Sequence, residues 1–135
     1  MKDLDTSHMA FVPKGDSMWP FLKNKKQTVI IKKDISDIKE YDVVLYTRAN
    51  GDNILHRVLQ ITDEGFICSG DSQFITEQVS KSQVVGVMVG YYKKEKYVEI
   101  DQRYRDKAKK YYRKTKKRKL RVKFHFTLRK VFKGK

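Results

Sequence analysis

Apolar and polar residues alternate along most of the first 92 residues in a pattern that is typical of β-strands. Five runs are rich in β-branched and aromatic residues, and each is bounded by turn-forming or charged residues: QTVIIKK (27–33), DVVLYTRA (42–49), NILHRVLQIT (53–62), GFICSGD (65–71) and QVVGVMVGYY (83–92). The segments RANGDN and TDEG lie between successive runs and predict tight hairpin turns. We therefore expect a mostly β fold from about residue 10 to residue 92, built as a sheet of antiparallel hairpins.

The remaining residues follow a different pattern. In DQRYRDKAKKYYRKTKKRK, the residues Tyr104, Ala108 and Tyr111 recur at intervals of four and three, which predicts a helix. The next segment, LRVKFHFTL, alternates with a period of two, so its conformation stays open between strand and helix. The sheet should therefore be followed by a C-terminal tail that is at least partly helical.

The charge divides at the same place. Residues 1–92 contain 11 Lys and Arg against 12 Asp and Glu, a net charge of −1, whereas residues 93–135 contain 20 against 4, a net charge of +16. The basic character of the chain thus belongs to the tail. We expect two regions, a domain over residues 1–92 and a basic extension over residues 93–135.

Length and composition limit the function classes further. The 135 residues suffice for one domain with a modest core, and no segment approaches the roughly 18 apolar residues that a membrane-spanning helix needs. The first dozen residues are too polar for a secretory signal. The single cysteine, Cys68, excludes an internal disulfide and a cysteine-based zinc site. We expect a cytoplasmic protein, held at most peripherally at a membrane, that uses no cofactor.

Three short motifs contain residues with catalytic potential. Ser17 follows Gly15-Asp16, His56 lies inside the apolar run ILHRVLQI, and Asp71 follows Gly70 at the end of a predicted strand. A serine hydroxyl needs a neighbouring base to act as a nucleophile, and a histidine base benefits from a carboxylate that fixes its tautomer. Taken singly, each residue also fits an ordinary turn or core position.

The order of these motifs resembles the signal peptidase I clan of serine peptidases, which includes the self-cleaving SOS and phage repressors. The nucleophile box Gly-x-Ser-Met-x-Pro is matched by residues 15–20, a Gly/Tyr-Asp-Val-Val strand by residues 41–44, and a Gly-Asp-Asn box by Gly70-Asp71-Ser72. His56-Arg57-Val58 is similar to the endoplasmic-reticulum-type branch, in which a histidine replaces the lysine base. The resemblance covers roughly residues 10–92, without the N-terminal membrane anchor of the family enzymes.

The resemblance implies a serine endopeptidase that cleaves an extended peptide, such as a leader or signal segment. Ser17 would be the nucleophile and His56 the base, with the backbone N–H of Ser17 donating to the oxyanion. Either Asp71 or Glu77, which is six positions further on, would orient His56, and we favour Asp71 because it lies inside the matched box. Met18, Trp19 and Pro20 would line the apolar entrance for the substrate.

Two other classes of function stay open. The domain could be a binding module that keeps the fold without catalysis. The tail, with its interleaved aromatic residues, could bind nucleic acid through phosphate contacts and stacking. It could equally bind an anionic membrane surface, which we favour, since basic runs with aromatic and aliphatic residues suit lipid headgroups.

Overall fold

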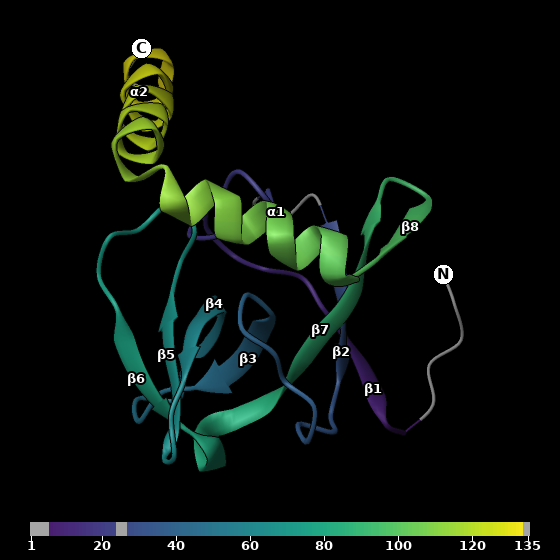
Figure 1. Ribbon diagram of the computed structural model, residues 1–135. Coiled ribbons are helices and arrows are strands. Elements are labelled where there is room, and N and C mark those ends of the chain that lie inside the picture. The colour runs from purple at the N-terminus through teal and green to yellow at the C-terminus, as the bar shows by residue number, and fades with distance from the viewer. Residues whose placement is uncertain (1–5, 24–26, 134–135) are drawn as a thin grey trace. The chain divides into compact units, whose positions relative to one another are not determined.

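The chain forms an antiparallel β-sheet followed by two helices (Figure 1), which confirms the predicted mostly β fold with a helical tail. The computed structural model describes residues 6–23 and 27–133, with side chains up to Leu128. The strands and the short 3-10 turn are β1 (His8–Phe11), β2 (Gln27–Lys32), β3 (Val43–Thr47), β4 (Asn53–Ile61), β5 (Gly65–Ser69), β6 (Glu77–Ser80), η1 (Lys81–Gln83), β7 (Val84–Lys93) and β8 (Lys96–Glu99). The helices are α1 (Gln102–Arg113) and α2 (Thr115–Lys133).

The strands pair in the order β1-β2-β7-β3-β4-β5-β6, and β8 pairs with β7. Figure 1 shows β1 and β6 at opposite ends of this sheet. The predicted turns at RANGDN and TDEG join β3 to β4 and β4 to β5, so both hairpins are confirmed. At the first turn Gly51 adopts a φ of 92°, a left-handed conformation that a residue without a β-carbon adopts most readily.

The central strands β3 and β4 are buried on both faces, which explains their long apolar runs. Val44 lies opposite His56 and Leu45 opposite Leu55, so His56 and Leu55 point to different faces of β4. The face that carries His56 also carries the main core cluster, made up of Val44, Tyr46, Val58, Phe66, Cys68, Val79 and Val87. The strand that carries His56, β4, thus runs through the packed core.

Three short strands, β1, β6 and β8, are absent from the prediction. Each has four residues, and only one of these twelve residues, Val79, is fully buried. Such short, half-polar segments lack the apolar alternation that identifies a strand, and they form because a longer strand lies beside them. β8 extends the sheet past the charge boundary at residue 92.

The chain divides into two compact units, Met1–Asp101 and Gln102–Lys135. The change in charge at residue 93 therefore falls within the β7–β8 hairpin, and the structural break comes after Asp101. In the second unit the segment LRVKFHFTL is helical, part of α2. Within this unit the Arg118 guanidinium lies 4.5 Å from the ring centre of Tyr112 and 5.6 Å from that of Tyr111, linking α2 to α1.

Candidate active site

Ser17 lies in a tight turn whose geometry depends on the preceding glycine. Gly15 has a φ of 84°, and the turn closes with the Trp19 N–H donating to the Asp16 carbonyl at 3.1 Å. Met18 and Leu22 are buried at 3% and 2% exposure and fix the segment to the core. The Ser17 side chain is left half-buried at the surface of the unit.

This serine turn packs directly against the Gly70-Asp71-Ser72 box. The Ser72 N–H donates to the Ser17 carbonyl at 3.0 Å, and the Ser72 hydroxyl donates to the Asp16 carbonyl at 2.8 Å. A β-carbon at Gly70 would lie 2.6 Å from the Ser17 carbonyl oxygen, so only glycine allows this approach without displacement. Two boxes that are far apart in the sequence are thus in contact.

Asp71 is engaged by Arg57 rather than by His56. The Arg57 guanidinium donates to both carboxylate oxygens, at 2.6 and 3.2 Å, and both side chains are fully buried. Arg57 also donates to the Tyr41 carbonyl at 2.9 Å and lies 4.8 Å from the centre of the Phe21 ring. This geometry gives Asp71 a structural role in holding the box, and it argues against our preference for Asp71 as the acid that orients His56.

The carboxylate that reaches His56 is Glu77, and it does so through Tyr46. The Tyr46 hydroxyl donates to Glu77 at 2.7 Å and lies 3.2 Å from Nδ1 of His56. Arg48 donates to both oxygens of Glu77, at 2.8 and 3.0 Å, and lowers the pKa of that carboxyl group. Glu77 is therefore ionised and can only accept hydrogen bonds.

The hydrogen-bond directions assign the tautomer of His56. Because the single hydroxyl proton of Tyr46 goes to the Glu77 carboxylate, Nδ1 of His56 must be the donor to the Tyr46 oxygen. The neutral imidazole then has its unprotonated lone pair on Nε2. The sequence did not single out Tyr46 and Arg48, although both follow Val44 at the strand period of two, on one face.

Burial keeps His56 neutral. The side chain is 4% exposed, and desolvation, followed by the positive charge of Arg48, lowers its pKa to about 4, against the opposing effects of Glu77 and Asp71. Burial also raises the pKa of Tyr46, with a further contribution from its hydrogen bond to Glu77. Tyr46 therefore keeps its proton and His56 remains an uncharged base at neutral pH.

The serine turn passes close to His56 without a hydrogen bond between the two side chains. Arg57 pairs with Ser69, so continuing this register by one residue places Gly70, which the Ser17 carbonyl approaches, beside His56. Over residues 6–23 and 27–128, neither Ser17 Oγ nor His56 Nε2 has a hydrogen-bond partner. Over the same residues, the only fully buried side-chain nitrogen or oxygen without a hydrogen bond is Nε of Arg118. Because Nε2 of His56 has no hydrogen bond either, it must be partly accessible to solvent.

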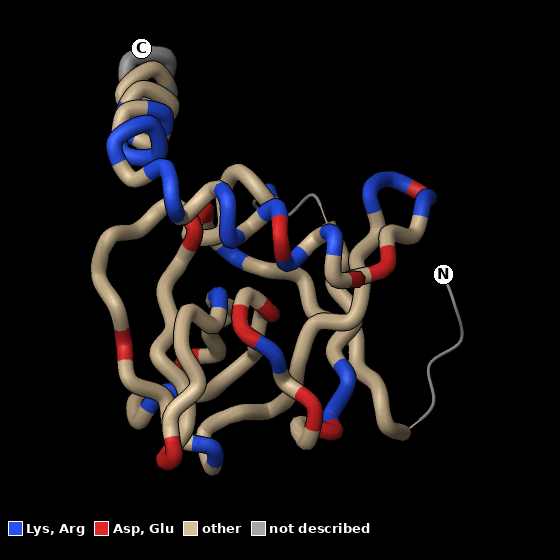
Figure 2. Tube along the Cα trace, viewed as in Figure 1, with Lys and Arg blue, Asp and Glu red and all other residues tan. Residues whose placement is uncertain are grey.

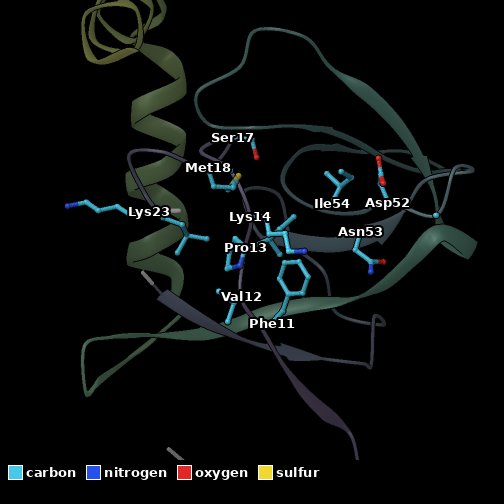
Figure 3. A pocket seen from close by; sticks show the side chains of 14 residues that line it. Phe11, Val12, Pro13, Lys14, Ser17, Met18, Lys23, Asp52, Asn53 and Ile54 are labelled. Atoms are coloured by element: carbon cyan, nitrogen blue, oxygen red, sulfur yellow. The ribbon is translucent and has the colours of Figure 1, made fainter. Parts of the chain in front are cut away.

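A hollow of about 390 Å³ opens next to the serine turn. Figure 3 shows Ser17 and Met18 on one side of it and Asp52, Asn53 and Ile54 on the other. Of the three residues predicted to bind substrate, Met18 lines the hollow, whereas Trp19 and Pro20 are half-buried outside its lining. His56 and Glu77 lie outside the lining as well.

The serine turn also presents backbone donors. Within the described segments, the N–H groups of Ser17 and Met18 donate to no other group of the chain. Adjacent unpaired N–H groups are the usual components of an oxyanion hole. Met18 therefore supplies a candidate for the second donor, which the sequence could not identify.

Comparisons of the chain with protein-family models, with curated proteins and with solved structures give no match. Among the residues that the structure describes, no group of three or more His, Cys, Asp or Glu side chains could hold a metal ion. The described helices include none that is long and apolar enough to cross a membrane.

Proposed function

We propose that this protein is a serine endopeptidase of signal peptidase I type, which cleaves an extended peptide such as a leader or signal segment. The observation that carries the proposal is the chain Glu77–Tyr46–His56, which fixes the imidazole with its basic nitrogen unprotonated beside the serine turn. A cytoplasmic location, expected from the single cysteine, is part of the same proposal.

In this mechanism the peptide binds in the hollow, and its binding brings Ser17 Oγ into hydrogen-bond reach of His56 Nε2. Catalytic hydrogen bonds are often long in unliganded enzymes and tighten with substrate. Ser17 Oγ attacks the scissile carbonyl while its proton passes to Nε2. The C–N bond then breaks, the leaving amine takes the proton from Nε2, and an acyl ester remains on Ser17.

Water completes the reaction. Nε2 of His56 takes a proton from the water as its oxygen attacks the ester carbonyl, and returns that proton to Ser17 as the acid product leaves. The Ser17 and Met18 N–H groups stabilise the oxyanion in both steps, each donor contributing about 3 kcal/mol. Tyr46 and Glu77 act as positioning residues that hold the imidazolium formed in each transition state.

Incubation with a degenerate library of extended peptides, read by mass spectrometry, tests the proposal. Ser17→Ala and His56→Ala should each abolish cleavage, and the double variant should be little worse than either single one, because the two residues act as a unit. Ser36→Ala, which changes an exposed serine outside the site, is the matched control and should cleave normally. Undiminished cleavage by Ser17→Ala would eliminate the serine mechanism.

A peptide-binding module without catalysis is the second candidate. It is favoured by the lack of a hydrogen bond between Ser17 and His56 over the described residues. In that case the library would contain peptides that bind the wild-type protein and are recovered intact. Binding of those peptides would then survive His56→Ala, because no step would need the base.

A further inference from the structure

Helix α2 carries an apolar stripe on its exposed side. Leu120, Phe124 and Leu128 are 69%, 67% and 41% exposed, and their spacing of four residues places them along one face of the helix. Arg118 and Val122, by contrast, are 8% and 5% exposed and belong to the buried side. Three large apolar side chains thus face solvent in a row. Single exposed apolar residues are common on protein surfaces, but a contiguous row of them is typical of an interaction site.

Positive charge surrounds this stripe. Residues 102–135 contain 17 Lys and Arg against one acidic residue, Asp106, whereas residues 1–101 carry a net charge of −1. Figure 2 shows Lys and Arg concentrated along both helices. The cations directly next to the stripe residues in sequence are Lys119, Arg121, Lys123 and Arg129. The partner of this surface must therefore be apolar at its centre and anionic around it.

We propose that the stripe of Leu120, Phe124 and Leu128 docks α2 on the surface of an anionic lipid bilayer, with the helix lying in the plane of the interface. The apolar side chains enter the boundary between headgroups and acyl chains, and the long basic side chains extend to the headgroups. Cations near such a surface add an electrostatic attraction that weakens as the salt concentration rises. This surface is independent of Ser17 and of the proposed peptidase activity.

The composition of the stripe distinguishes lipid from nucleic acid. Phosphate contacts require only the cations, and base stacking requires aromatic rings. Two of the three exposed apolar side chains are leucines, which do not stack on bases and would stay in water in a nucleic-acid complex. A bilayer interface buries all three. The apolar residues Val131 and Phe132 follow the stripe in sequence, and their side chains lie outside the described residues.

Co-sedimentation of the full chain with phosphatidylcholine vesicles, with and without phosphatidylglycerol, tests the proposal at about 0.15 M salt. The wild type should bind only the anionic vesicles. The triple variant Leu120→Ser, Phe124→Ser, Leu128→Ser should bind them at least tenfold more weakly, since three apolar side chains lose their burial. The matched control, Ile61→Ser with Ile75→Ser, removes one exposed apolar residue of β4 and one of the loop before β6, and should bind as the wild type does.

A second measurement guards against simple loss of helix in the triple variant. In Phe124→Trp, the new indole should be quenched by lipids brominated in the acyl chains, while the native Trp19 of the wild type provides the unquenched baseline. Equal binding by wild type and triple variant, or an unquenched Trp at position 124 on bound vesicles, would overturn the proposal. So would tight binding to duplex or single-stranded oligonucleotides with none to anionic vesicles.

Discussion

At the scale of single residues, the two carboxylates near His56 have different physical surroundings. Asp71 is fully buried against the Arg57 guanidinium, whereas Glu77 is partly exposed and holds the Tyr46 hydroxyl. Removing one partner of a buried ion pair leaves an uncompensated buried charge and lowers the stability of the fold. Removing the contact that fixes the tautomer of a histidine changes the orientation and protonation of the imidazole instead. Mutations of Asp71, and of Tyr46, which links Glu77 to His56, should therefore affect different quantities.

We expect Asp71→Asn to lower the free energy of unfolding by about 3–5 kcal/mol. Tyr46→Phe should instead lower kcat on the order of a hundredfold, because the imidazole loses the acceptor that keeps its proton on Nδ1. Urea unfolding and peptide turnover, measured on both variants, separate the two effects. A large fall in kcat confined to Asp71→Asn, with stability unchanged, would restore Asp71 as the orienting acid.

The pKa of His56 predicts how stability responds to pH. The pKa lies at about 4 in the folded chain against an ordinary value of 6.5, so between these values the unfolded chain binds a proton that the folded chain does not. The free energy of unfolding therefore falls as the pH is lowered from 6.5 towards 4, because protonation of His56 favours the unfolded chain. Above pH 6.5 there is no loss, and the total loss is about 3 kcal/mol. Unfolding by urea at pH 7.5 and 4.5 should show a smaller difference in His56→Gln than in the wild type. Equal differences in the two proteins would contradict the assigned burial.

At the scale of elements, the site depends on the contact between the serine turn and the end of β5. Gly70→Ala should displace the turn, because its β-carbon would meet the Ser17 carbonyl, and should lower both the cleavage rate and the stability, the latter by about 1–3 kcal/mol. Gly90→Ala is the matched control, since its β-carbon would meet the Tyr97 ring, and neither residue lines the hollow. It should lower stability by about 1–3 kcal/mol and leave cleavage unchanged. Normal cleavage by Gly70→Ala would show that the contact does not position Ser17.

The sequence predicts the elements and contacts that have local signals. Long β-branched runs identify β2, β3, β4, β5 and β7. The ordered boxes suggest that Ser17, His56 and Asp71 belong to one site, but they do not predict the contact between Ser17 and Gly70. The role of Tyr46 has no local signal, because it depends on contact between Tyr46 of β3 and Glu77 of β6, two strands that are not neighbours in the sheet. The helical state of LRVKFHFTL is likewise hidden, since its alternating apolar positions also contain the i, i+4 stripe of α2.

At the scale of the whole molecule, the division after Asp101 predicts where the chain can be shortened. A protein of residues 1–101 should keep the full sheet and unfold cooperatively, with a circular dichroism spectrum dominated by strands. A protein of residues 1–92 should be less stable, because β7 loses its pairing with β8. If the two shortened chains were equally stable, the folded domain would end at residue 92, where the charge changes, and not at Asp101.

The position of Glu77 on β6 couples the base to the edge of the sheet. Among the described residues β6 is a four-residue strand paired on one side only, with β5, and such edges open locally long before a domain unfolds as a whole. When β6 frays, Glu77 withdraws, the Tyr46 proton is free to turn towards Nδ1, and His56 can shift its own proton onto Nε2. In the proposed mechanism the imidazole then stops being a base towards Ser17 while the rest of the sheet stays folded. Warming would thus reversibly silence the proposed pair of Ser17 and His56, at temperatures where the protein still shows an intact core.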